Sequence, residues 1–256
     1  MKQRLVIKVG SNVLTRADGT LNITRISAIV DQIAELRKLR HEVILVSSGA
    51  VASGRSELRV ESHLDSVEQR QLFSAIGQVR LINHYYDLFR EHNIHIGQVL
   101  TMKENFQAGE QYQNQKACMQ LMLDMGVLPI VNENDTVALT ELMFTDNDEL
   151  SGLIAKMLKA DKLILLSNID GIYDGDPKNP ESKVIEKVAP GTDLSEYIHR
   201  EKSSFGRGGM ESKYHTASSV AKEGIDVIIA NGTRDNILVD LITAPETVLH
   251  TEFQAP

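Results

Sequence analysis

Short apolar runs that alternate with helix-length segments are the feature that most constrains how this chain can fold. The runs are rich in β-branched residues and span residues 5–9, 43–46, 94–100, 128–131, 163–166 and 227–230. Continuous apolar strands of this kind are typical of a sheet that is covered on both faces. Between the first two runs, Ile26, Ile29, Ile33 and Leu36 follow the spacing of one helix face.

This alternation predicts the fold class. Strand-helix-strand units are right-handed and place helices on the faces of a parallel sheet. We therefore expect an α/β fold, a three-layer α/β/α sandwich with a mostly parallel central sheet. Because no linker or low-complexity tract divides the chain, we predict one domain over residues 1–256. Further helices are expected near residues 66–91, 112–125, 147–160 and 211–223.

Composition narrows the function classes. The formal net charge is -8, with 27 Lys and Arg against 35 Asp and Glu. Nucleic-acid binding needs clustered cations, so this balance argues against a general nucleic-acid binder. The single cysteine, Cys118, allows no intrachain disulfide, and its apolar neighbours predict a buried core thiol. The sequence shows neither a signal-peptide pattern nor a bilayer-length apolar run, so we expect a cytoplasmic protein.

Glycine and polar residues follow the predicted strands at the edge where parallel sheets bind ligands. Glycine at a strand-to-helix turn lets backbone N–H groups approach an anion, and the following helix adds its positive end. We therefore expect phosphate or carboxylate cradles at Gly10 and Gly49. The candidates at this edge are Gly10, Ser11, Ser48, Gly49, Ala50, Asp135, Ser167 and Asn168.

Two lysines are candidates for binding an anion. Lys8 lies in an apolar strand, where an unpaired ammonium group costs several kcal/mol. The alternative is an edge-strand lysine that reaches water. Lys213 follows a glycine-rich helix entry at residues 206–209, whose spacing is not that of a Walker A loop.

The segment Asp146-Asn147-Asp148 opens a predicted helix and has more polar residues than an N-cap requires. We expect Asp148 to pair with both lysines. Asn147 and Asp135 are candidates for binding a substrate ammonium or carboxylate group. The irregular residues 169–210 form a long excursion between two core strands, and such loops are usually functional.

Together these motifs resemble the amino acid kinase family. The resemblance extends from about residue 4 to about residue 240. The segments at residues 132–135 and 146–148 are similar to those of the glutamate-phosphorylating branch. The motifs are, in chain order, Lys8 to Ser11, Ser47 to Ala50, Ile130 to Asp135, Asp146 to Asp148 and Gly208 to Lys213.

The resemblance implies a role for each matching position. Lys8 and Lys213 would grip the transferred phosphoryl group, and Asp148 would orient them. Substrate binding would fall to Ser48, Gly49, Ala50, Asp135 and Asn147. Nucleotide binding would fall to Lys8, Gly10, Ser11, Ser167, Asn168, Arg207, Gly208, Gly209, Met210, Glu211, Ser212 and Lys213. Asn168 and Arg207 depart from the residues common at their positions in the family.

The implied reaction is ATP-dependent phosphorylation of the side-chain carboxylate of L-glutamate to L-glutamyl 5-phosphate, the first step of proline biosynthesis. ATP would be the phosphoryl donor, with Mg²⁺ carried on the nucleotide and no direct protein ligand. The family also implies a homo-oligomer, feedback inhibition by proline and glutamate-5-semialdehyde dehydrogenase as a partner, with no nucleic acid or membrane. Many members carry a small C-terminal PUA domain, which we expect to be absent here.

Two other interpretations remain open on the sequence. Another family member that acts on a related carboxylate, such as aspartate or acetylglutamate, would share most of these motifs. From a different class, a non-catalytic sensor of ATP and an amino acid would share the binding residues. A pure sensor, however, has no chemical reason to keep Lys8, Asp148 and Lys213 together.

Overall fold

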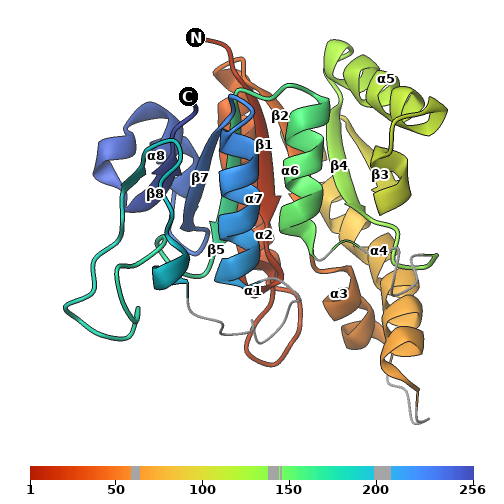
Figure 1. The fold of residues 1–256 in the computed structure, drawn as a ribbon. Helices are drawn as coiled ribbons and strands as arrows, with labels where there is room; N and C mark the ends of the chain where they lie inside the picture. Colours follow the sequence, from red (N-terminus) through yellow and green to blue (C-terminus); the bar gives the residue numbers. More distant parts are fainter. Residues whose placement is uncertain (59–63, 138–143, 145, 199–208) are drawn as a thin grey trace.

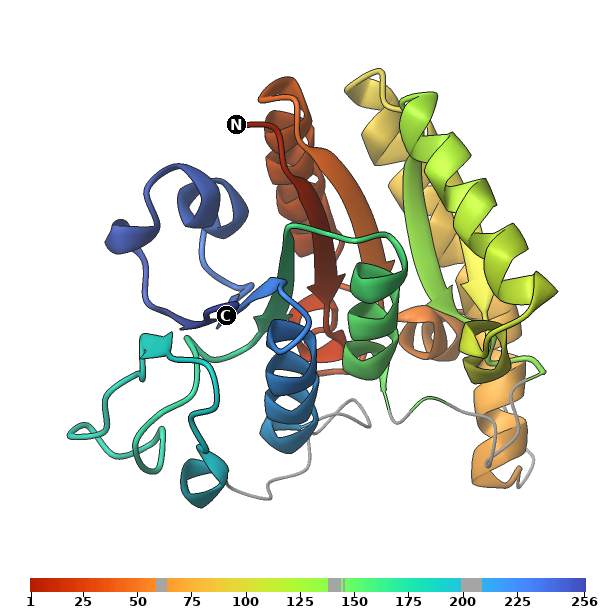
Figure 2. The same cartoon turned by 45° about the horizontal axis from the view of Figure 1, so that its top comes forward.

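The computed structural model describes residues 1–58, 64–137, 144, 146–198 and 209–256, and in this part of the chain a central sheet lies between two layers of helices (Figure 1). The two views agree that α6 and α7 stand on one side of the sheet and α2 on the other (Figure 2). One layer contains α2 (Ile23–Lys38), α4 (Ser66–Glu91) and α8 (Ile237–Thr243). The other contains α5 (Glu110–Asp124), α6 (Asn147–Met157) and α7 (Met210–Ala221). The predicted three-layer sandwich is confirmed.

The described residues form an eight-stranded sheet in the order β3-β4-β2-β1-β5-β7-β8-β6. The pairings are parallel except for that of β7 with β8, which is antiparallel. The strands are β1 (Arg4–Val9), β2 (Glu42–Ser47), β3 (Ile96–Thr101), β4 (Leu128–Glu133), β5 (Lys162–Ser167), β6 (Lys187–Val188), β7 (Asp226–Asn231) and β8 (His250–Phe253). Every predicted strand is therefore present. The sequence did not predict β6 and β8, because both are short and neither contains a continuous apolar run.

The core is divided by the sheet into two clusters of buried side chains. In β1, Leu5, Ile7 and Val9 pack on the side of α2, whereas Val6 packs on the side of α6 and α7. Successive strand side chains point to opposite faces, so a sheet covered on both faces needs apolar residues at every position. This requirement explains why the strand sequences show little polar alternation.

Helix α5 covers the edge of the sheet and is largely exposed. It buries only Met119 and Leu123 among its residues, which lie one turn apart on one face. Cys118 lies just beside that face and is exposed. The prediction of a buried core thiol is therefore wrong, because the apolar run around Cys118 is wider than the stripe that the fold buries.

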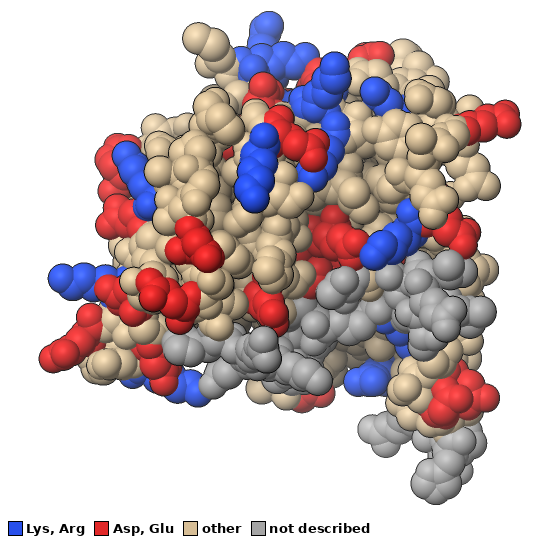
Figure 3. All heavy atoms as spheres, viewed as in Figure 1, with Lys and Arg blue, Asp and Glu red and all other residues tan. Residues whose placement is uncertain are grey.

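The face of the molecule drawn in Figure 3 is mixed in charge. On the face shown in Figure 3, Lys and Arg side chains are interspersed with Asp and Glu side chains. No helix in the described ranges is sufficiently long and apolar to cross a membrane.

Short helices follow two of the central strands at their carboxyl ends. Helix α1 (Ser11–Leu14) follows β1, and α3 (Ala50–Glu57) follows β2. Helix α3 crosses α4 at a point where both helices have glycine. A Cβ atom on Gly77 would lie 1.8 Å from the carbonyl oxygen of Ala50, and one on Gly54 would lie 1.9 Å from that of Phe73. The two backbones are thus in direct contact, which sets the position of α3.

We expect Gly77→Ala to lower the free energy of unfolding by about 1–3 kcal/mol, because the added methyl group forces α3 and α4 apart. The gain in helix propensity, about 1 kcal/mol, opposes this loss without cancelling it. Urea denaturation measures the change. Gly109→Ala is the matched control, since a Cβ atom there meets nothing within 4 Å. Equal stability of the two variants would contradict the role of the crossing.

Candidate active site

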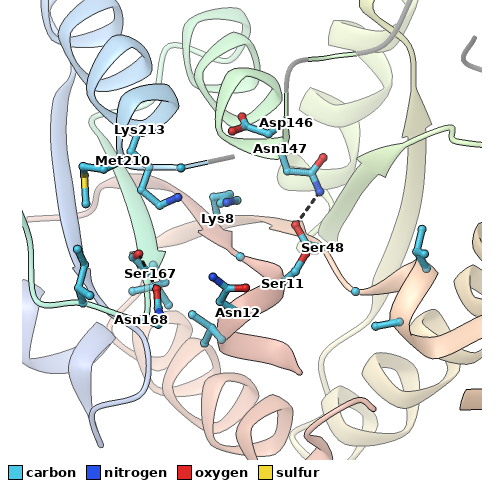
Figure 4. A pocket seen from close by; sticks show the side chains of 18 of the residues that line it. Lys8, Ser11, Asn12, Ser48, Asp146, Asn147, Ser167, Asn168, Met210 and Lys213 are labelled. Carbon is cyan, nitrogen blue, oxygen red and sulfur yellow. Dashed lines mark hydrogen bonds between the residues drawn. The ribbon is translucent and has the colours of Figure 1, made fainter. Parts of the chain in front are cut away.

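The carboxyl ends of β1, β2, β4 and β5 border one cavity of about 1480 Å³. This is the sheet edge at which the sequence predicts ligand binding. Figure 4 shows Lys8, Ser48 and Ser167 around this cavity, each contributed by the end of a different strand or the turn after it. The predicted site residues that line the cavity are Lys8, Gly10, Ser11, Ser48, Gly49, Ala50, Asp135, Asn147, Ser167, Asn168, Gly209, Met210 and Lys213.

Other predicted residues lie elsewhere. Asp148 is fully buried behind the cavity wall, with no exposed surface. Glu211 and Ser212 belong to the first turn of α7 but are not part of the cavity lining. Arg207 and Gly208 lie outside the described residues. The excursion after β5 contributes part of the wall, from Ile169 to Lys178, as its length suggested.

Lys8 and Lys213 meet at Asp148. The Nζ atom of Lys8 lies 2.6 Å from Oδ1 of Asp148, and the Nζ atom of Lys213 lies 3.0 Å from Oδ2. The side chains of the two lysines are only 6% and 9% exposed. Since β1 lies between β2 and β5, Lys8 is in the centre of the sheet. The alternative of an edge-strand lysine is excluded, and the predicted ion-pair cluster is confirmed.

The electrostatics of this cluster favour an anionic ligand. Burial by itself would raise the pKa of Asp148, but the ammonium groups of Lys8 and Lys213 lower it to about 2. Burial lowers the pKa of Lys8, and the charge of Lys213 lowers it further, while Asp148 acts in the opposite direction. With one carboxylate between two ammonium groups, Lys8, Asp148 and Lys213 together have a net charge of +1 when ionised, and the buried Asp146 in the same cavity lining also acts on Lys8. A phosphate in the cavity would supply the missing negative charge.

The local sequence places these charges. Asp146 caps α6, and its Oδ1 atom accepts hydrogen bonds from the backbone N–H groups of Asp148 at 2.8 Å and Glu149 at 3.1 Å. This cap puts Asp148 in the first turn, which faces β1. Gly209 precedes α7, so Lys213 also lies in the first turn of its helix, close to the positive end of the helix dipole.

Ser48, Gly49 and Asn147 form a second side of the cavity. The side-chain Nδ2 atom of Asn147 donates to Oγ of Ser48 at 2.9 Å and to Oδ1 of Asn132 at 3.0 Å (Figure 4 shows the former). Gly49 has a φ of 107°, a left-handed conformation that favours glycine, and it begins α3. The turn therefore presents Ser48 and the start of α3 to the same space as Asn147.

Arg70 and Glu133 are site residues to which sequence reasoning assigned no role. Arg70 lies on α4 and lines the cavity. Its Nη2 atom is 2.7 Å from Oε2 of Glu133, and its Nε atom is 2.7 Å from Oδ1 of Asp135. Glu133 was visible only as part of a family motif. An arginine in a long amphipathic helix has no distinguishing local signal, so Arg70 could be found only from the tertiary structure.

Burial and, to a lesser extent, the neighbouring Asp135 raise the pKa of Glu133 from 4.5 to about 7, although the charge of Arg70 acts in the opposite direction. The folded state therefore binds more protons than the unfolded state between pH 4.5 and 7. Hence we expect the free energy of unfolding to fall as pH rises through this window. Urea denaturation at pH 5 and pH 7.5, compared with Glu133→Gln, measures the effect. An identical pH dependence in the variant would contradict the assignment.

The carboxylates that line the cavity are spread over several segments of the chain. Within the described ranges, no three or more His, Cys, Asp or Glu side chains are grouped to bind one. Both Asp148 oxygens already face lysine ammonium groups. This donor set fits a cation that is held mainly by nucleotide phosphates, as Mg²⁺ often is.

Comparison with known proteins agrees with this geometry. A family model described as "Amino acid kinase family" matches residues 3–231. The chain belongs to the amino acid kinase family. The ion-pair cluster, the cavity and most of the sheet of this kinase lie within the matched residues. The prediction from the motifs is confirmed.

Among curated relatives, this kinase is 64% identical over 99% of its length to the glutamate 5-kinase of Bacteroides thetaiotaomicron, of which it covers 71%. It is 49% identical over 92% of its length to the glutamate 5-kinase of Chlorobaculum tepidum, of which it covers 65%. The chain thus spans about two thirds of the length of these relatives.

A solved structure shows the same fold at low sequence identity. The substrate complex of an isopentenyl phosphate kinase has a TM-score of 0.69 and 17% identity to this chain. The match covers 98% of this chain and 100% of the other. At this identity the likeness supports the fold alone.

Proposed function

We propose that this kinase transfers the γ-phosphoryl group of ATP to the side-chain carboxylate of L-glutamate, giving ADP and L-glutamyl 5-phosphate, the first step of proline biosynthesis. The observation that carries the proposal is the buried cluster of Lys8, Asp148 and Lys213, with ion-pair distances of 2.6 and 3.0 Å. Its excess positive charge faces a cavity large enough for two ligands. The glutamate 5-kinase relatives support the choice of glutamate.

The cavity has two sides around the lysines. In Figure 4, Ser167, Asn168 and Met210 lie on one side of Lys8, and Ser48 and Asn147 lie on the other. We assign the first side to the nucleotide and the second side to glutamate. This arrangement would direct the γ-phosphate and the acceptor carboxylate toward the two lysines.

The chemistry needs no general base. A glutamate side chain has an ordinary pKa near 4.3, so its carboxylate is already a nucleophile at neutral pH. The enzyme must instead hold two anions in line, and the transition state spreads negative charge over the equatorial oxygens. Lys8, Lys213 and the backbone N–H groups at the Gly10 and Gly49 turns supply positive charge there. Mg²⁺ carried on the nucleotide would neutralise further phosphate charge.

A hydroxylamine-trapping assay tests substrate and reaction type together. With ATP, Mg²⁺ and glutamate, we expect hydroxamate to form and ADP to be released in equal amounts. Aspartate and acetylglutamate, assayed in parallel, should give much less of both products. Preferential reaction with either of them would favour another kinase specificity. Binding of ATP and glutamate without release of ADP would favour the sensor.

We further propose the cellular setting that the family resemblance implies. The kinase would act in the cytoplasm, which the single cysteine supports, and would assemble as a homo-oligomer. Proline would inhibit it by feedback. An acyl phosphate hydrolyses readily, so glutamate-5-semialdehyde dehydrogenase would take up the product directly.

A further inference from the structure

A cluster of Arg70, Glu133 and Asp135 lies in the cavity apart from the two lysines. It is next to the proposed glutamate side, because Glu133 directly follows Asn132, which accepts a hydrogen bond from Asn147. Arg70, Glu133 and Asp135 all line the cavity. The phosphoryl-transfer mechanism assigns no role to Arg70 or Glu133.

The arginine joins helix α4 to the end of strand β4. Arg70 projects from α4 and contacts Glu133 at the end of β4 and Asp135 just after it. The Oε1 atom of Glu133 accepts a hydrogen bond from the backbone N–H group of Phe144 at 3.0 Å. Arg70 thereby holds both carboxylates in place, while Glu133 is also tied to the chain that leads into α6.

The cluster contains more negative than positive charge. One guanidinium group faces two carboxylates that are only 3% and 9% exposed, so the ionised cluster has a net charge of -1. Burial raises the pKa values of both Glu133 and Asp135 in spite of Arg70. One further cation in this part of the cavity would balance the charge. Counted over its three residues alone, the ionised group of Lys8, Asp148 and Lys213 has the opposite charge of +1.

We propose that Arg70 is a positioning residue that holds Glu133 and Asp135 as one singly negative cluster, and that this cluster selects substrates with a free α-ammonium group. The inference rests on the proposed function and specifies how the amino acid is recognised. An amino acid with a side-chain carboxylate has the matching charges, an ammonium group at one end and an anion at the other. An N-acylated or deaminated acid lacks the ammonium group and leaves the buried negative charge uncompensated.

A charge series tests the proposal through the KM for glutamate. The ionised cluster has a net charge of 0 in Glu133→Gln and -2 in Arg70→Gln, whereas the double variant returns it to -1. We expect the KM for glutamate to rise about tenfold or more in each single variant, since loss of one partner from a buried charge pair has effects of this size or larger. The double variant should recover part of this loss. The KM for ATP should stay within about twofold throughout.

Substrate analogues give a second readout. Glutarate lacks the amino group and acetylglutamate carries it acylated, and both should inhibit the wild-type enzyme weakly. In Glu133→Gln, the ratio of each inhibition constant to the KM for glutamate should fall several-fold. These analogues should bind relatively better because the uncompensated negative charge is gone. Unchanged ratios would overturn the selection of a free ammonium group.

Two further variants serve as controls. Arg80→Gln, on the same helix, removes an exposed arginine that pairs with Glu57 and should leave both KM values unchanged. Arg70→Lys keeps the positive charge, so its KM for glutamate should lie between those of the wild type and Arg70→Gln. This variant keeps the test decisive if Arg70→Gln folds poorly. If Arg70→Gln raised the KM for ATP and the KM for glutamate equally, Arg70 would have a structural role only.

The wild-type enzyme separates this inference from the proposed function. If it forms no hydroxamate from glutamate, the proposed function fails. If it does, but Arg70→Gln keeps the wild-type KM for glutamate, only the inference about Arg70 fails.

Discussion

Lys213→Ala is expected to reduce turnover by about 10²- to 10³-fold or more, the size of effect seen when one preorganised charge-stabilising group is removed. The ammonium group of Lys213 lies 3.0 Å from Asp148 and lines the cavity, so it is fixed before the substrates bind. Alanine leaves the negative charge of the moving phosphoryl group without one of its two cations. Lys8→Ala should have an effect of similar size for the same reason. Initial rates of ADP release at saturating ATP and glutamate measure the loss.

Lys222→Ala is the matched control. Lys222 lies at the other end of α7, where it is exposed, so its loss should leave turnover unchanged. Wild-type turnover in both Lys8→Ala and Lys213→Ala would rule out the two-lysine clamp. A large rise in KM with unchanged kcat would instead show that the lysines bind the ground state only.

Asp148→Asn is expected to lower the free energy of unfolding by about 3–5 kcal/mol, because removing one partner of a buried ion pair leaves uncompensated charge behind. Here the unpaired groups would be the ammonium groups of Lys8 and Lys213. We also expect ATP to raise the melting temperature of this variant more than that of the wild type, since the phosphates replace the lost negative charge. Thermal denaturation with and without ATP measures both effects.

Asp124→Asn provides the control for this experiment, because Asp124 ends α5 at the surface. The pH dependence gives an independent check. The pKa of Asp148 in the folded state is about 2, below its ordinary 3.8, so its stabilising contribution is complete above about pH 4. It is lost as pH falls through about 2. If Asp148→Asn were as stable as the wild type at neutral pH, the cluster would have no structural role.

Local patterns in the sequence were enough to predict the layers of the fold. The strand runs are apolar at successive positions because both faces of each central strand are buried, as in β1. Helix α4 follows the predicted range of residues 66–91 because its apolar spacing and its cap at Asp65 are both local. Where the local signal is weak, prediction failed. Helix α3 contains small residues and Gly54 in place of an apolar stripe, and β8 has an alternating pattern.

The candidate site was likewise predicted in part from local sequence patterns. Gly49, Ser48 and the cap at Asp146 could be predicted, because turns and caps depend on a few neighbouring residues and parallel strands end at a common edge. The pairing of Lys8 and Lys213 with Asp148 was also predicted, because a lysine in an apolar strand needs a partner of opposite charge and the family resemblance implies the same role. Asp148 and Lys213 are 65 residues apart in the chain.

The tertiary structure alone showed that Arg70 reaches Asp135, which is also 65 residues away. It also showed that Cys118 faces outward and that Gly77 touches α3. These contacts depend on how helices sit on the sheet and on each other. Spacing along one element predicts which face of it is apolar, whereas the partner of a charged or small side chain is decided by packing between elements that are distant in sequence.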